Sequence, residues 1–215
     1  MTCRPPEFPL DPLIDIWPKG KTIHVIYDVT YTPDSFNPGI DAKGVLRNPT
    51  RFAPIHALTE NIVPYMYGGS SLECAIFETV FHNVPIDAAD KFVDLDGFAT
   101  RGHGEIAPQR DLQLVDLTTD GLHRLKVSKA ELINSAPIDY LCTAKWAQAI
   151  HQQFPHVDGM LWMSRQRDRD HALVLFGDRI GSGLTGKRIG GALKLNDTLR
   201  QKILAMALRV GIDAS

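Results

Sequence analysis

The chain has 215 residues, of which 44% are hydrophobic and 22% are charged, with a formal net charge of −2. This composition is typical of a globular protein and excludes the fibrous and disordered classes. The 23 basic residues are balanced by 25 acidic ones and form no long basic run, so we expect no direct contact with nucleic acid.

No stretch approaches the roughly 20 apolar residues that a membrane-spanning helix needs, so we expect no membrane segment. The N-terminal sequence MTCRPPEFPLDPLIDIW is interrupted by prolines and acids and lacks the apolar core of a signal peptide. Together these features predict a cytoplasmic protein.

The cysteines, Cys3, Cys74 and Cys142, are odd in number and widely spaced. Their spacing matches neither a disulfide framework nor a zinc site. We interpret Cys74 and Cys142 as small core residues.

Taken in chain order, the first expected element is an extended N-terminal arm over residues 1–20, because prolines recur along it. A single domain over residues 21–215 follows. Residues 21–29, KTIHVIYDV, are rich in β-branched side chains and predict a strand. The next segment is dense in Pro, Gly, Asn and Asp and predicts a long loop. Since it carries Tyr31 and Arg47, we expect it to contact a ligand.

Residues 63–67 predict a short strand that ends at Gly68-Gly69. Ser70 or Ser71 then offers an N-cap for a helix with the sequence LECAIFETVFH, which Pro85 ends. The remaining expected elements are a strand at 112–117, a helix within 135–154, strands at 159–164 and 172–176 joined by the charged connection RQRDRDH, and a helix over about 197–210 that begins at Asn196 or Asp197 and stops at Gly211. The pattern predicts one α+β domain.

Two patterns invite a ligand assignment that we reject. Residues 181–187 match GxxxxGK, but Arg188 stands where a phosphate-binding loop needs Ser or Thr, and the following Ile189-Gly190-Gly191 argues against a helix. The histidines, including His103 beside Glu105 and the pair His151 and His156, lack HExxH-type spacing. We interpret them as solvated surface groups and expect no metal.

Glu78 lies in the otherwise apolar segment AIFETVF, one helical turn from His82. A carboxylate on such a face must be hydrogen-bonded, paired or directed into a cleft, because burying it unpaired is costly. Read alone, Glu78 is better explained as an ion-paired or surface glutamate than as a functional residue.

Glu78 belongs, however, to an ordered set of phrases. These are FNPG at 36–39, RFAP at 51–54, YGGSSLECAIFETVFH at 67–82 and DGMLWMSR at 158–165. Over residues 21–180 the set resembles the RES domain, a family named for its Arg, Glu and Ser. The resemblance matches these to Arg51, Glu78 and Ser164 as catalytic residues, and it adds Tyr67 to the ligand-binding residues.

The resemblance implies an α+β fold of mixed sheets flanked by helices, similar to ADP-ribosyltransferases of the diphtheria-toxin type. It also implies the toxin of a toxin–antitoxin pair, held inactive by an Xre-type helix-turn-helix antitoxin. Such toxins arrest growth by cleaving the nicotinamide–ribose bond of NAD. They either degrade NAD or transfer ADP-ribose to a cellular protein. NAD is then the substrate, and no cofactor is permanently bound.

The residue chemistry agrees with this reading. A carboxylate at Glu78 can stabilise the positive charge that develops on ribose and orient the attacking group. Arg51 is suited to grip the pyrophosphate through two hydrogen bonds, Tyr67 to stack on nicotinamide or bond a ribose hydroxyl, and Ser164 to bond ribose or the carboxamide. Tyr31 and Arg47 are expected to contribute to binding from the loop.

Val25 departs from the family pattern, which usually has an arginine at this position in the first strand. Three explanations stay open: weaker NAD binding, replacement by Lys21, Arg47 or another base, and a changed activity. A second hypothesis is therefore a non-catalytic NAD or ADP-ribose-binding module. A third, a hydrolase with Cys74 or Ser164 as nucleophile, lacks a supporting motif.

Overall fold

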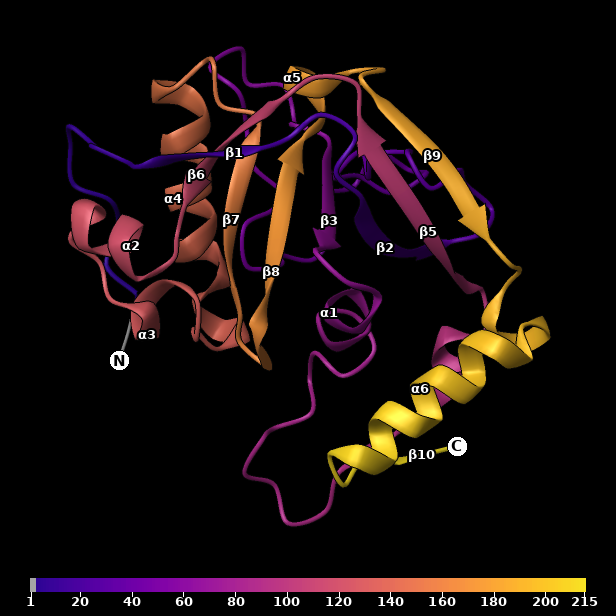
Figure 1. The fold of residues 1–215 in the computed structure, drawn as a ribbon. Helices are drawn as coiled ribbons and strands as arrows, with labels where there is room; N and C mark the ends of the chain where they lie inside the picture. The colour runs from indigo at the N-terminus through magenta and orange to yellow at the C-terminus, as the bar shows by residue number, and fades with distance from the viewer. Residues whose placement is uncertain (1–2) are drawn as a thin grey trace.

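The computed structural model describes residues 3–215, and an eight-stranded mixed sheet forms its centre (Figure 1). The strands follow the order β1-β6-β7-β8-β3-β2-β5-β9. Only β6 and β7 pair in parallel among these neighbours. Their bounds are β1 Ile14–Trp17, β2 Ile23–Asp28, β3 Tyr65–Gly69, β5 Arg101–Pro108, β6 Leu112–Asp116, β7 Gly159–Ser164, β8 Arg167–Phe176 and β9 Leu184–Ile189.

Helices and one small sheet complete the fold. The short strands β4 (Phe92–Val93) and β10 (Asp213–Ala214) pair in parallel near the C-terminus. The helices are α1 Leu72–Phe77, α2 Thr119–Leu125, α3 Lys129–Leu132, α4 Tyr140–Gln153, α5 Gly177–Ile180 and α6 Asp197–Arg209, with 3-10 turns η1 Leu95–Phe98, η2 Pro137–Asp139 and η3 Leu193–Leu195. The predicted α+β class is confirmed. No helix within residues 3–215 is long and apolar enough to cross a membrane.

The central strands are buried on both faces, which explains why their sequences are continuous apolar runs. In β8, Leu173 and Leu175 join one core cluster, whereas Val174 and Phe176 join another. Successive strand residues point to opposite faces, so the alternation places one cluster on each side of the sheet. The cluster that contains Leu173 and Leu175 also contains residues of β1 and β6, near one edge of the sheet, and of β5 and β9, near the other. Because strands from both edges contribute to one cluster, the sheet curves around it.

Two helical layers cover the other face. The inner side of α4, including Ala147 and Ile150, packs with strands β6, β7 and β8. The short helix α1 packs on β2, β3 and β8, and its residues Ile76 and Phe77 share a cluster with Ile203 of α6. In Figure 1, α1 consequently lies below β3, between the α2–α4 group and α6. This packing places the C-terminal end of α1 close to the middle of the sheet.

Several predicted elements match the structure, including β2, β6, β7, α4 and α6. Asn196 caps α6 through its side chain, and no helix follows the GxxxxGK pattern, which runs into β9 instead. Within the expected N-terminal arm, residues 14–17 form the edge strand β1.

Other boundaries were wrong. The helix expected over residues 72–82 ends at Phe77, well before Pro85, and Gly68-Gly69 belong to β3. The charged connection RQRDRDH mostly belongs to β8, which begins at Arg167. Strands β5 and β9 were not anticipated because glycines interrupt their patterns. Those glycines allow close approach of a loop, since a Cβ at Gly104 would lie 2.6 Å from Pro33 Cβ.

The cysteines follow the prediction only in part. Cys74 is buried in the core, as expected. Cys142 is half-buried in α4 and forms a disulfide with Cys3, across a sequence separation of 139 residues. The pairing depends on how the N-terminal segment lies against α4. It is reinforced where Trp146 Nε1 donates to the Arg4 carbonyl at 2.7 Å. Spacing along the chain carries no information on such a contact.

The contact between β3 and α1 gives a first prediction. A Cβ at Gly69 would lie 2.8 Å from Cys74 Cβ and 2.9 Å from Ala75 N, so Gly69→Ala must push α1 away from the sheet. We expect it to lower the free energy of unfolding by about 1–3 kcal/mol. Gly97→Ala is the matched control, because nothing lies within 4 Å of its Cβ position. Urea unfolding measures both, and equal stability of the two variants would contradict the proposed tight packing.

Candidate functional site

A pocket of about 800 Å³ opens where β2 and β3 diverge. The ladder between these strands consists of one pair, His24 with Gly69. Beyond that pair, residues 25–28 of β2 and 65–68 of β3 line the pocket instead of bonding to each other. The volume lies within the range of small-molecule sites. Residues of the long loop predicted after β2 line another side of the pocket, as expected for a loop near a ligand site.

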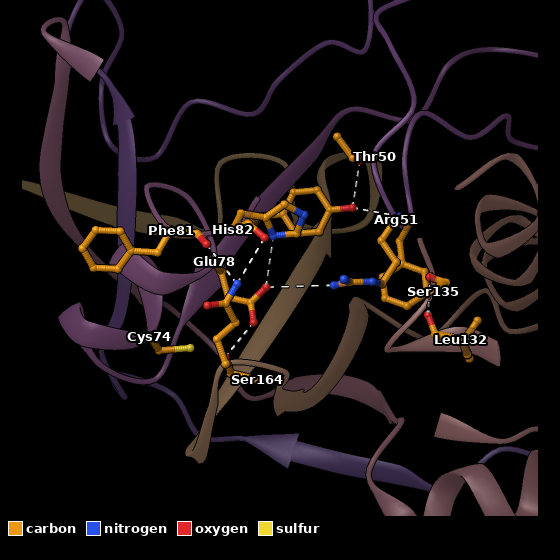
Figure 2. Close-up of polar contacts among 12 residues, drawn as sticks. Thr50, Arg51, Cys74, Glu78, Phe81, His82, Leu132, Ser135 and Ser164 are labelled. Atoms are coloured by element: carbon orange, nitrogen blue, oxygen red, sulfur yellow. Dashed lines mark hydrogen bonds and ion pairs between the residues drawn. The ribbon is translucent and has the colours of Figure 1, made fainter. Parts of the chain in front are cut away.

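Glu78 reaches this pocket from the end of α1. Ser71 caps the helix by accepting a hydrogen bond from Cys74 N, and Glu78 is the C-cap residue six positions beyond the first helical residue. Its side chain is 12% exposed. The hydroxyl of Ser164, at the end of β7, donates to Glu78 Oε1 at 2.7 Å. Figure 2 shows the carboxylate between Ser164, His82 and Arg51.

Two nitrogen-bearing side chains flank the other carboxylate oxygen. Arg51 Nη1 lies 3.9 Å and His82 Nδ1 lies 3.8 Å from Glu78 Oε2. His82 Nε2 is in turn 3.0 Å from the Tyr140 hydroxyl. Arg51 is 4% exposed, and its backbone carbonyl accepts a hydrogen bond from the Thr143 hydroxyl of α4. The fold thus brings Arg51, from the long loop, next to Glu78, from the end of α1.

These contacts keep Glu78 ionised. Burial alone would raise the pKa of the Glu78 carboxyl. The close approach of His82, the hydrogen bond from Ser164 and the nearby charge of Arg51 outweigh burial and hold that pKa below its ordinary value. At neutral pH the pocket therefore contains a fixed negative charge.

The Tyr67 ring lines the pocket, but its hydroxyl is already engaged. The backbone N–H of Phe52 donates to Tyr67 Oη at 2.9 Å, and Thr50 Oγ1 lies 3.0 Å from the same oxygen. Because the Thr50 hydroxyl donates to the Ala53 carbonyl, Tyr67 is the donor to Thr50. The hydroxyl thus fixes the loop that carries Arg51, while the ring packs edge-on against Trp162. The geometry fits a stacking surface better than a hydroxyl bonded to ribose.

Ser164 requires a correction. It is fully buried, does not line the pocket, and uses its hydroxyl proton in the bond to Glu78. The direct hydrogen bond expected from Ser164 to a ligand is therefore replaced by a bond that positions the carboxylate.

The remaining sequence candidates lie at the pocket mouth. Tyr31 and Arg47 are exposed and line the pocket. Val25, where the resemblance leads us to expect arginine, is buried in the pocket wall. Lys21 does not compensate for it, because its ammonium group lies over the Trp17 ring, 4.0 Å from the centroid, and outside the pocket. Of the replacements considered by name, only Arg47 lies where a pocket ligand can reach it.

Sequence reasoning suggested that Tyr27 and His24 could face the cleft, and of these Tyr27 lines the pocket while His24 does not; it gave no role to the pocket residues Arg101, Tyr140 and Trp162. Arg101 begins the unanticipated strand β5, and nothing in its local pattern marks it. Within the described residues, three buried polar atoms on the pocket wall lack hydrogen-bond partners: Arg51 Nε, Tyr27 Oη and Trp162 Nε1. Such atoms indicate where polar atoms of a ligand or water bind.

The structure also bears on the cysteine and histidine interpretations. Burial, with the charge of Glu78 nearby, raises the pKa of the Cys74 thiol to about 12, so Cys74 is not a thiolate nucleophile at neutral pH. His103 and His151 are buried, at 5% and 1% exposure, rather than solvated. His156 is exposed, as expected. The polar partner of His151 is Asp178, at 2.9 Å.

Removing the Tyr67 hydroxyl should affect stability. Tyr67→Phe leaves the Phe52 N–H without its acceptor, so we expect the free energy of unfolding to fall by about 1–3 kcal/mol. Tyr31→Phe is the matched control, because that side chain is exposed, and its effect should stay within about 0.5 kcal/mol. Urea unfolding of both variants tests this; an unaffected Tyr67→Phe protein would show that the hydroxyl does not hold the loop.

The lowered pKa of Glu78 predicts a dependence of stability on pH. A carboxyl whose pKa is lower in the folded state stabilises the fold fully above its unfolded pKa, about 4.3, and loses that contribution as the pH falls through the folded value. The unfolding free energy of the wild type, measured relative to that of Glu78→Gln, should therefore decrease as the pH falls below about 4.3. Urea unfolding across pH 2–7 measures it, and a difference independent of pH would contradict it.

A family model described as the RES domain matches residues 25–192. No curated protein matches the chain. Among solved structures, the crystal structure of the M. tuberculosis MbcT–MbcA toxin–antitoxin complex contains a chain with a similar fold, with a TM-score of 0.54 and 14% identity. The alignment covers 88% of this chain and 92% of that one. The chain belongs to the RES domain family.

Proposed function

We propose that this protein is a toxin of a toxin–antitoxin pair that cleaves the nicotinamide–ribose bond of NAD. The observation that carries the proposal is the ionised Glu78 carboxylate, held at the pocket wall by Ser164 and flanked by Arg51 and His82. The RES family supports NAD as the substrate. We place the activity in the cytoplasm.

Glu78 acts on the charge that moves during the reaction. As the bond between the ribose C1′ and nicotinamide breaks, its electron pair leaves with nicotinamide and neutralises the cationic ring. Positive charge then develops on ribose, and a preorganised carboxylate beside C1′ stabilises it. Because Ser164 and His82 already orient Glu78, little reorganisation accompanies this change. The same carboxylate can orient the oxygen that attacks C1′.

The arginines would hold the anionic part of the substrate. Arg51 lies deep in the pocket, where its buried Nε has no hydrogen-bond partner, and Arg47 and Arg101 contribute positive charge elsewhere on the wall. A guanidinium can bond two phosphate oxygens at once, which fixes the pyrophosphate in one orientation. Tyr67 and Trp162 would present ring surface to the nicotinamide end. Val25 contributes no charge, so the pyrophosphate would depend on these three arginines.

Two reactions share this first step. Water or phosphate as the attacking group degrades free NAD, whereas a side chain of another protein accepts ADP-ribose. The wide, exposed mouth at Tyr31 and Arg47 is compatible with both. A second candidate function, a binding module without turnover, is favoured by one observation: an apolar Val25 occupies the wall where the family usually has arginine.

An antitoxin is the proposed protein partner, and the family resemblance suggests the Xre-type helix-turn-helix class. The structural neighbour comes from a toxin–antitoxin complex. Two apolar side chains that flank the pocket residue Tyr140 in sequence are strongly exposed, Ile138 at 89% and Leu141 at 69%. An exposed apolar rim of this kind is suited to a protein interface. An antitoxin bound there would cover the pocket, and adding it should stop NAD cleavage.

The decisive measurement is nicotinamide release from NAD by the purified protein, with and without phosphate, with products separated by chromatography. Glu78→Gln should lower the rate by about 10²–10³-fold or more, the effect of removing one preorganised charge-stabilising group. Glu60→Gln, an exposed loop carboxylate outside the pocket, is the matched control and should retain the wild-type rate.

The co-product distinguishes the reactions: ADP-ribose indicates hydrolysis, and its phosphorylated form indicates phosphorolysis. Label from NAD that becomes attached to a cellular protein would indicate transfer. Binding of NAD without nicotinamide release, in free buffer and in cell extract, would instead favour the binding module. Equal rates for the wild type and Glu78→Gln would overturn the role given to the carboxylate.

A further inference from the structure

A second group of ligand-bearing side chains lies outside the pocket, on strands β2 and β5. These strands lie side by side in the sheet (Figure 1). His24 of β2 pairs in register with Glu105 of β5, and His103 is two residues before Glu105. Residues directly opposite, and those two apart on one strand, point to the same face of a sheet. All three side chains therefore lie on the face that also carries His24's neighbour α1.

The three side chains converge on one point. One ligand atom from each of His24, His103 and Glu105 lies within 4.8 Å of the other two. The closest pair is His24 Nδ1 and His103 Nε2, 3.0 Å apart. Two nitrogens bound to a tetrahedral zinc ion, at about 2.0–2.1 Å each, are separated by about 3.4 Å. Widening the nitrogen pair by a few tenths of an ångström would thus admit an ion.

The geometry points to a divalent transition-metal site formed by His24, His103 and Glu105, with Zn²⁺ as the best-fitting ion. Two imidazoles and one carboxylate form a donor set that zinc uses in proteins, and the fourth position is left to water. This site goes beyond NAD cleavage, since none of its residues lines the pocket. It also differs from the expectation, drawn from sequence spacing, that the histidines bind no metal.

The alternative is a hydrogen bond between the two imidazole rings, without an ion. That bond explains the short nitrogen distance but leaves Glu105 unexplained. In the described part of the chain, the half-buried Glu105 carboxylate accepts no hydrogen bond and forms no ion pair within 4.0 Å.

The surrounding charges are compatible with an added cation. Glu73 of α1 acts on His24 with its negative charge. Positive charge comes from Lys202 of α6, which acts on His103, and from Lys187 of β9, which is opposite Glu105 in the ladder. Both lysines are exposed, so their ammonium groups can stay in water while an ion occupies the site.

Such an ion would join β2 to β5 through side chains as well as through the backbone ladder. Since β2 also forms a wall of the pocket, the ion would stabilise that wall without touching a ligand there. Anything that binds the folded chain and not the unfolded chain raises its stability. The expected signature is therefore metal-dependent thermal stability rather than metal-dependent chemistry.

The test uses the full chain, stripped of metal with a chelator and then titrated with Zn²⁺ against a chromophoric competitor. We expect one Zn²⁺ per chain and a rise in the melting temperature. Glu105→Gln and His24→Gln should each weaken binding by about tenfold or more and abolish the rise. His156→Gln, an exposed histidine outside the cluster, should bind like the wild type.

Cobalt gives a readout that does not depend on stability. Co²⁺ in place of Zn²⁺ should produce visible absorption bands in the wild type that are missing in Glu105→Gln, with matching circular dichroism showing that both metal-free proteins are folded. The proposal is overturned if the wild type fails to bind Zn²⁺ stoichiometrically, or if Glu105→Gln and His24→Gln bind it as tightly as the wild type. Neither result would bear on NAD cleavage, which depends on Glu78.

Discussion

The buried charge of Glu78 is the constraint on which the site depends. An ionised carboxylate at 12% exposure is costly unless hydrogen bonds and opposite charge compensate for it. The compensation comes from three parts of the chain: Ser164 at the end of β7, His82 just beyond α1, and Arg51 from the long loop. Each of these must be in place before the carboxylate is tolerated.

The rest of the fold can be understood as support for these contacts. α1 must end at Phe77 so that Glu78 turns toward the pocket, and Gly69 must lack a side chain so that α1 lies directly on β3. The loop that carries Arg51 is held from below by the Tyr67 hydroxyl and from the side by Thr143 of α4. Residues that are far apart in sequence therefore all contribute to the position of the Glu78 carboxylate.

Sequence reasoning recovered the elements whose pattern is local. The strands β2 and β7 and the helices α4 and α6 have clear apolar spacing or clear capping residues, and the structure has them close to the predicted positions. The Arg, Glu and Ser of the candidate site were found through family resemblance, and the structure brings Arg51 and Ser164 to Glu78. The roles of individual atoms were less accessible. Nothing in the sequence indicates that the Ser164 hydroxyl faces the carboxylate rather than the pocket.

The failures share a physical cause. β5 was missed because Gly102 and Gly104 interrupt its pattern, yet these glycines serve contacts with other segments. The Cys3–Cys142 disulfide and the cluster around His103 join residues that are distant in sequence, so spacing rules could not reveal them. Where a residue's environment is set by tertiary contacts alone, propensity and spacing say little about it.

The hydroxyl of Tyr67 has a consequence for how the pocket evolves. By fixing the inner end of the loop, it separates a buried floor around Arg51 from an outer rim in which the side chains of Tyr31 and Arg47 are exposed to solvent. A preorganised floor binds its ligand without the entropy loss of ordering it. Substitutions on the rim can then alter which molecules reach the pocket while leaving the arrangement around Glu78 intact. One scaffold can in this way change the access to its pocket without changing the residues at its floor.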